Sequence, residues 1–144
     1  MKKLSLLVIV YGFVFCLSTA YAQTGALTVE ISGINQAKGL MSTGLFSDEE
    51  GFPGKGKEYM GKEVKVTGKT VVHTFRDVPF GTYAVAVHHD ANSNQKMDKN
   101  FLGIPKEDYA FSNNVFGVFG LPPSFKDASF KFYGNKTIKI KITH

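Results

Sequence analysis

The sequence predicts an all-β fold, a single antiparallel β-sandwich of about seven short strands, and three observations support this prediction. Apolar and polar residues alternate with a period of two in several segments, which are separated by turns rich in glycine and proline. An aromatic content of 13% supplies the apolar surface that a core requires. No window of about eleven residues has clear helical spacing, and residues 46–60 have room for one helical turn at most.

The first 22 residues have the features of a secretory signal peptide. A short basic start precedes an apolar run over residues 4–17, and residues 20–22 form a small-x-small cleavage site. The apolar run is 14 residues long, whereas a membrane-spanning helix needs roughly 20. We therefore expect cleavage before Gln23 and no membrane span afterwards. The predicted organisation is a signal peptide at 1–22 followed by one β-sandwich domain at 23–144.

Cysteine content and charge narrow the class of protein further. The one cysteine, Cys16, lies inside the predicted signal peptide, so the domain has neither a disulfide nor a cysteine-based zinc site. Without Lys2 and Lys3 the net charge falls from +5 to +3, and the remaining lysines are scattered, which argues against nucleic-acid binding. We expect a bacterial protein exported to the periplasm or the medium, with a protein or small-ligand partner in the cell envelope.

Seven segments carry the strand pattern. In the last of them, isoleucine alternates with lysine or threonine, which predicts one face in the core and the other in solvent. The predicted strands are 27–31, 40–47, 64–66, 71–75, 83–87, 130–132 and 137–142.

One turn refines the architecture. Pro79, Phe80 and Gly81 form a tight turn, and Tyr83 then opens a strand whose inward residues are apolar. This arrangement resembles turns that are common in transthyretin-like and immunoglobulin-like domains, and it favours that type of sandwich.

A loop after the predicted strand 83–87 carries oxygen-bearing side chains at a regular spacing. Asp90, Asn92, Asn94 and Asp98 follow the pattern D-x-N-x-N-x-x-x-D, and the carbonyl of Lys96 stands where calcium loops use a backbone oxygen. Calcium takes six to eight oxygen ligands, which alternate residues of a tight loop can direct to one centre. The pattern therefore predicts a calcium site at Asp90, Asn92, Asn94, Lys96 and Asp98.

The match to a calcium loop is partial. Gln95 stands where a glycine is expected, Phe101 stands where helix-flanked calcium loops carry a bidentate glutamate, and no helix is predicted on either side. Two carboxylates supply little charge unless Glu107 or Asp108 completes the site. The alternative interpretation is a connecting loop whose Asp and Asn side chains bond their own backbone as Asx-turns.

Two adjacent histidines precede this loop. Neighbouring residues on a strand point to opposite faces, so His88 and His89 cannot hold one metal together. His89 shares the face of Tyr83, which predicts a hydrogen-bonded core histidine, whereas His88 lies on the opposite face, near Asp90. A site around His88, Asp90 and Glu107 is the alternative functional hypothesis. Ser112 has no acid or base suggested beside it, and we expect residues 112–114 to brace the loop.

These same residues carry a family resemblance. The run from His89 to Asn100, the segment Gly103-Ile104-Pro105-x-Glu107 and the segment Phe111-Ser112-Asn113-Asn114 are similar to the signature of a bacterial exported family known as domain of unknown function 2141. The turn at 79–84 and the segment 128–130 agree with it. The resemblance implies a small exported β-domain and no assigned activity.

Three classes of function remain open. The sequence favours a noncatalytic exported module whose Asp/Asn loop is braced by calcium or by itself, because its carboxylates and amides gather on one loop. The alternatives are a periplasmic enzyme with His88, Asp90 and Glu107 around a cleft, or a small-ligand carrier that uses the aromatic stretch 109–119. Calcium is the one cofactor that the sequence suggests.

The calcium prediction is tested by thermal unfolding of the mature domain. An ion that binds only the folded loop raises the melting temperature by mass action, and two carboxylates place the affinity near 10⁻⁴ to 10⁻³ M, that is, about millimolar. Asp90→Ala should abolish the response more completely than Asn92→Ala, because it removes a charge as well as an oxygen. A melting temperature that stays constant from chelator to about 10 mM calcium at fixed ionic strength would leave only the Asx-turn interpretation.

Overall fold

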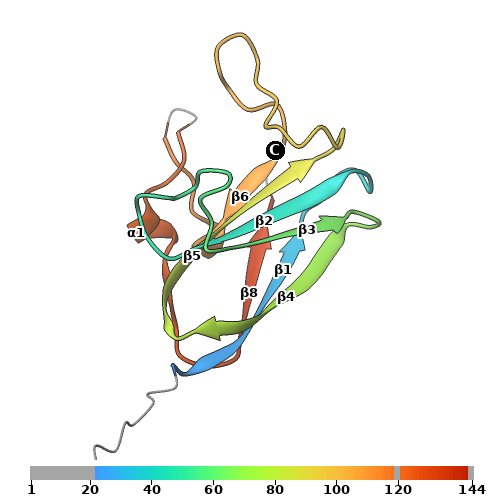
Figure 1. Cartoon of the computed structure of the whole chain (residues 1–144). Helices are drawn as coiled ribbons and strands as arrows, with labels where there is room; N and C mark the ends of the chain where they lie inside the picture. Colours follow the sequence, from blue (N-terminus) through green and yellow to red (C-terminus); the bar gives the residue numbers. More distant parts are fainter. Residues whose placement is uncertain (1–21, 119–120, 143–144) are drawn as a thin grey trace, which may run out of the picture.

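The structure is a computed structural model that describes residues 22–118 and 121–142 (Figure 1). Residues 1–21, with nearly all of the predicted signal peptide, lie outside the described residues. The described part is an all-β fold, as the sequence predicted. Its elements are β1 (Thr24–Ser32), β2 (Leu40–Phe46), β3 (Met60–Lys65), β4 (Thr70–Pro79), β5 (Gly81–Asp90), β6 (Tyr109–Phe111), η1 (Ser112–Asn114), α1 (Phe125–Ala128), β7 (Phe130–Phe132) and β8 (Lys136–Lys141).

The strands form two sheets (Figure 1). The smaller sheet has the order β4-β1-β8, and the larger sheet has the order β3-β2-β5-β6, with the short β7 also paired to β5. The described residues contain eight strands, close to the predicted number of about seven. The prediction of purely antiparallel pairing was wrong, since β1 and β8 pair in parallel: the chain leaves β7 in the larger sheet and enters the smaller sheet running in the direction of β1.

The predicted alternation places one face of each sheet in a shared core. Leu27, Val29 and Ile31 of β1 are fully buried, and Ile140 of β8 is 1% exposed. They belong to one cluster with inward-facing residues of the larger sheet, so the two sheets bury their apolar faces against each other. The residues from the larger sheet are Met41, Leu45, Tyr83, Val85, Val87, Ala110 and Phe132.

Strand β4 keeps its apolar residues inward through a bulge. Pairing with β1 passes from Leu27 opposite Phe75 to Gly25 opposite Val78, so β4 contains one extra residue. Asp77 in this stretch has a φ of 54°, a left-handed conformation that aspartate tolerates better than most residues. As a result Phe75 and Val78 are both buried although they are three residues apart.

Tyr83, which lies two residues into β5, closes the turn between β4 and β5. Its hydroxyl donates a hydrogen bond to the Pro79 carbonyl at 2.9 Å, and the side chain is 5% exposed. Burial, with a smaller contribution from Tyr59, raises the pKa of Tyr83 above its ordinary value. The tyrosine therefore stays neutral and fixes the start of β5.

Two histidines lie in the core with different partners. His89 is 2% exposed and its Nε2 lies 2.8 Å from the Lys38 carbonyl, which agrees with the predicted hydrogen-bonded core histidine. His73 packs edge-on against Phe75, and neither of its ring nitrogens has a hydrogen-bond partner among the described residues. Burial, followed by the nearby Lys62, lowers the pKa of His73, so it stays neutral at physiological pH.

Helical structure is sparse and lies where it was not expected. Residues 46–60 contain turns and bends but no helical turn. The four-residue helix α1 begins after Ser124, whose hydroxyl accepts a hydrogen bond from the Asp127 amide at 3.2 Å. Within residues 22–118 and 121–142, no helix has the length and apolar character needed to cross a membrane.

Two substitutions on β8 test the assignment of its faces. Ile140→Asp places an unpaired charge in the core and should destabilise the domain by about 4 kcal/mol or more. Lys139→Asp lies on the solvent face, where the lysine side chain is 81% exposed and 3.6 Å from Glu30, and should cost less than about 1 kcal/mol. Urea denaturation measures both free energies of unfolding. Similar losses of stability for the two variants would contradict a strand with one face in the core and the other in solvent.

Candidate functional site

The outer face of the larger sheet, opposite the core, has a floor of small side chains. Ser42 and Gly44 of β2, Gly61 of β3 and Ala86 of β5 project little from the sheet. Gly44 pairs with both Gly61 and Ala86, so three neighbouring strands carry no bulky side chain at the same point of this face. This floor underlies a cleft of about 750 Å³.

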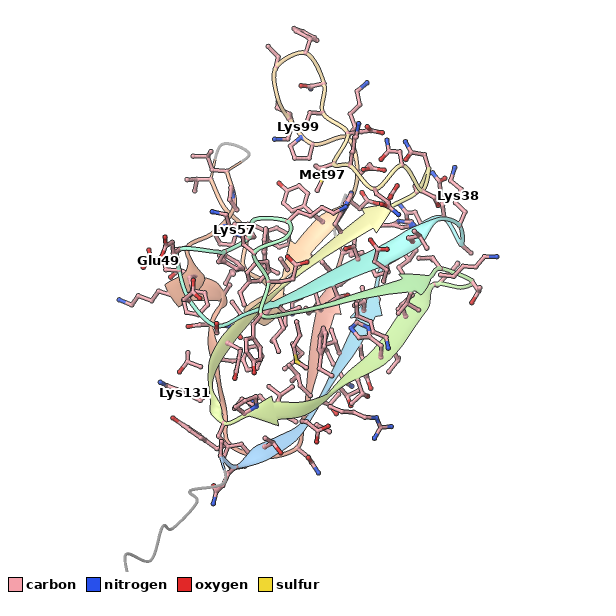
Figure 2. All side chains as sticks on the ribbon, in the orientation of Figure 1. Lys38, Glu49, Lys57, Met97, Lys99 and Lys131 are labelled. Atoms are coloured by element: carbon pink, nitrogen blue, oxygen red, sulfur yellow. The ribbon has the colours of Figure 1, made fainter. Side chains whose placement is uncertain are left out.

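Two loops form the sides of the cleft. One loop, residues 47–59, connects β2 to β3, and the other, residues 91–108, connects β5 to β6. The Lys55 amine donates a hydrogen bond to the Gln95 carbonyl, which joins the two loops. Met97 and Lys99 lie on the loop above the sheet (Figure 2). The loop and edge residues that line the cleft are Pro53, Lys55, Glu58, Met97, Lys99, Gly103, Pro105 and Pro122.

Aromatic rings wall one side of the cleft. The Phe52 ring lies edge-on against Phe46, Phe111 and Phe125, with ring centroids 5.3 to 5.9 Å apart. Tyr109 packs against Phe111 in the same way at 5.7 Å. Phe46, Tyr109 and Phe111 line the cleft, and because Phe46 and Phe111 are 3% and 4% exposed, they make this wall apolar while leaving little ring surface open.

A histidine and a glutamate meet at one end of the cleft. His88 lines the cleft, and its Nε2 lies 2.8 Å from Oε2 of Glu107, whose side chain is 8% exposed. The same carboxylate oxygen accepts a hydrogen bond from the Asp98 amide at 3.1 Å. Glu107 therefore orients the His88 ring and also holds the 91–108 loop against β5.

A second glutamate lies over the floor. A Cβ atom built on Gly61 would lie 3.1 Å from Oε1 of Glu58, so glycine at this position leaves space for the carboxylate. The other oxygen of Glu58 is buried and has no hydrogen-bond partner in the described part of the chain. A buried carboxylate oxygen without a donor is costly, and a bound group with an N–H or O–H would satisfy it.

The predicted metal residues lie together in one loop, where they bond one another. Asp90 is 2% exposed, and its two oxygens accept hydrogen bonds from the Asn94 amide at 3.1 Å and the Gln95 amide at 2.6 Å. The side-chain amides of Asn92 and Asn94 donate to the two oxygens of Asp98 at 2.7 and 3.0 Å. The Lys96 amide donates to the Asn94 side chain at 2.8 Å. These are the bonds expected of an Asx-braced loop, and calcium binding stays a prediction.

Gln95, which stands where calcium loops usually have a glycine, has a backbone conformation that glycine adopts easily. Gln95 has a φ of 61° and Ser93 has a φ of 59°, both in the left-handed region that side chains rarely enter. The buried carboxylate of Asp90, which holds the Gln95 amide, offsets part of that cost.

The structure separates the residues of the alternative site. His88 and Glu107 are brought together, but the Asp90 carboxylate is directed into its own loop, and Asp90 does not line the cleft. Ser42 stands opposite His88 in the β2–β5 pairing, yet no hydrogen bond joins the two side chains in the described structure. Among the described residues, no three His, Cys, Asp or Glu side chains gather as a metal-holding group.

The segment after β6 braces the domain rather than the loop. The Ser112 hydroxyl accepts a hydrogen bond from the Val85 amide at 2.8 Å and donates one to the Ala128 carbonyl at 2.6 Å. Asn113 donates to carbonyls on either side of Ala128, and Asn114 accepts from the Lys141 amide. Residues 112–114 therefore connect the larger sheet to α1 and β8, and the expected contact with the 90–98 loop was wrong.

Sequence reasoning missed most of the cleft. Ser42 and Gly44 were included in a predicted strand without a role, and neither Glu58 nor Gly61 was singled out. The available signal was a row of small residues at alternate positions of β2 and β5, which predicts a strand face that no bulky side chain covers.

A family model described as "Uncharacterized protein conserved in bacteria (DUF2141)" matches residues 29–141. The matched region begins in β1 and ends at the last residue of β8, so it includes both sheets and the cleft. Among curated proteins and among solved structures, nothing matches the chain.

Removal of Glu107 tests its role in holding the loop. Glu107→Ala leaves His88 Nε2 and the Asp98 amide without their partner, and should cost about 1–3 kcal/mol of stability. Hydrogen exchange should become faster at the Asp98 amide and stay unchanged in β1. Glu49→Ala, at an exposed position on the other loop, is the matched control and should have no effect on either measurement. If both variants behave alike, Glu107 does not anchor the loop.

Proposed function

We propose that this chain, which belongs to the DUF2141 family of proteins conserved in bacteria, is a noncatalytic module that binds a small molecule in the cleft on the larger sheet. The family description names no activity, so the proposal is based on the geometry of the cleft. The observation that carries this proposal is the floor of Ser42, Gly44, Gly61 and Ala86 beneath a cleft of about 750 Å³. Small-molecule sites have volumes of about 300–1,000 Å³.

The lining supports a ligand with an apolar part and a polar end. Phe46, Tyr109 and Phe111 make one wall of the cleft apolar. His88, fixed by Glu107, and the unpaired oxygen of Glu58 provide a small number of oriented polar groups. Apolar walls with a few directed polar atoms are typical of sites that select a ligand by shape and orientation.

A binding role is supported over a catalytic one by what surrounds His88. A nucleophile activated by a histidine lies within hydrogen-bond reach of it. Ser42 and Tyr109 stand opposite His88 on the two neighbouring strands, and neither hydroxyl bonds to His88 in the described residues. Glu107 shares its carboxylate between His88 and the Asp98 backbone. The pair is therefore suited to orienting a ligand and holding a loop.

We also propose that the module works in the cell envelope and has the immunoglobulin-like or transthyretin-like type of sandwich. The basic start, apolar run and cleavage pattern of residues 1–22 support export. Two sheets with one shared core support the sandwich.

Calcium binding at Asp90, Asn92, Asn94, Lys96 and Asp98 is a separate proposal, supported by the gathering of their oxygens in one loop. Bound calcium would replace the hydrogen bonds from the Asn side chains to Asp98.

The experiment is native mass spectrometry of the protein purified from cells without chelator, together with a variant that fills the cleft. Ala86→Leu adds three carbons to the floor and should lower occupancy by a co-purified small molecule at least about tenfold, because the ligand and the new side chain compete for space. Val72→Leu makes an exposed apolar side chain larger on β4 of the other sheet and should retain the ligand.

Circular dichroism and the melting temperature show whether both variants keep the native fold. A small molecule that stays bound to folded Ala86→Leu would contradict the proposed site. A wild-type protein that carries no ligand and binds none from a metabolite extract would contradict the proposed function.

A further inference from the structure

The 91–108 loop ends in a well-formed turn that exposes apolar side chains. The Asn100 amide donates to the Ile104 carbonyl at 2.8 Å, and the Gly103 amide donates to the Asn100 carbonyl at 2.9 Å. The Asn100 side chain also accepts hydrogen bonds from the amides of Leu102 and Ile104. Lys99 and Pro105 form a β-bridge below this turn. The backbone of the tip is therefore held by its own hydrogen bonds.

Three large apolar residues at this tip face solvent. Phe101 is 95% exposed, Leu102 is 68% exposed and Ile104 is 48% exposed. Figure 1 shows the yellow-to-orange loop extending well beyond the ends of β5 and β6, away from both sheets. Adjacent exposed apolar side chains at a protruding tip are unfavourable in water and mark a surface that another apolar phase covers.

The charged side chains of the loop differ in exposure. Lys96, Lys99 and Lys106 are exposed and flank the tip on both sides. Asp98 and Glu107 alternate with these lysines along the chain but are engaged within the loop, because Asp98 accepts hydrogen bonds from two asparagine side chains and Glu107, whose side chain is 8% exposed, is paired with His88. The distal part of the loop therefore presents apolar side chains with a collar of positive charge.

We propose that this tip is a membrane-docking element that inserts Phe101, Leu102 and Ile104 into the interface of an anionic lipid bilayer. An apolar tip enters the boundary between headgroups and acyl chains. Each lysine near an anionic surface raises the affinity roughly fivefold, which corresponds to about 1 kcal/mol. A second copy of the chain is a poorer occupant, because tip-to-tip contact would bring the two lysine collars together. The inference is independent of the ligand proposed for the cleft.

The proposal has a consequence for the cleft. Met97, Lys99, Gly103 and Pro105 belong to the same loop and line the cleft. A docked tip would therefore hold the cleft beside the membrane surface, where a ligand with an apolar part is concentrated.

Fluorescence of a single introduced tryptophan tests the docking. The chain contains no tryptophan, so Phe101→Trp gives one emitter at the tip. Its emission should shift to shorter wavelength with vesicles of about one part phosphatidylglycerol to three parts phosphatidylcholine, and brominated lipid should quench it. Tyr133→Trp, at a 68% exposed aromatic position between β7 and β8, is the matched control and should show neither change.

The charge component is tested in the same assay. Pure phosphatidylcholine vesicles, or sodium chloride raised from about 0.1 M to about 1 M, should weaken binding about tenfold or more. The double variant Lys96→Glu with Lys106→Glu should do the same while the melting temperature stays unchanged, because both side chains are exposed. Absence of a shift with anionic vesicles would overturn the proposal. A shift that depends on protein concentration without lipid would overturn it in favour of self-association.

Discussion

The alternation of side chains along β5 is the constraint on which the rest of the structure depends. This strand pairs with β2 on one side and with β6 and β7 on the other. Its inward residues, from Tyr83 to His89, fill the shared core, and its outward residues, Ala86 and His88, form part of the cleft. Because side chains alternate strictly on a strand, a slip of one residue would exchange core and site. Fold and site are therefore specified by the same register.

The sequence predicted the parts of the molecule that depend on this alternation. Overlapping positions for every strand except β6, the inward isoleucines of β8, the core position of His89 and the outward position of His88 all follow from a period of two. The parallel pairing of β1 and β8 and the bulge in β4 could not be predicted in this way, because they depend on which distant strands become neighbours. Alternation specifies which face a residue lies on, but not which strand lies beside it.

The cleft was harder to predict because it is formed by the absence of side chains. A glycine in a strand is usually taken as a weak position, and nothing local in the sequence brings Gly44 next to Gly61 and Ala86. The alternative site named from the sequence did include His88 and Glu107, which the structure brings together across most of the 91–108 loop, but it did not include the glycine floor beside them. The Asp/Asn spacing was visible in the sequence, but it is compatible with two arrangements of the same oxygens. In the described structure those oxygens accept hydrogen bonds from the loop itself.

The 91–108 loop has a base that is held by hydrogen bonds and a tip that is exposed to solvent. Because the base is fixed, the apolar residues of the tip can stay exposed without disordering the loop. Asp90 and Glu107 are buried at the two ends of the loop, and each holds backbone amides of residues between them. These contacts order the loop without any apolar packing of its tip, so Phe101 and Leu102 need not fold back onto the sheet. A loop held mainly by hydrophobic contacts would cover its apolar residues and the cleft with them. Anchoring by buried carboxylates instead leaves the cleft open on one side and an apolar tip projecting on the other.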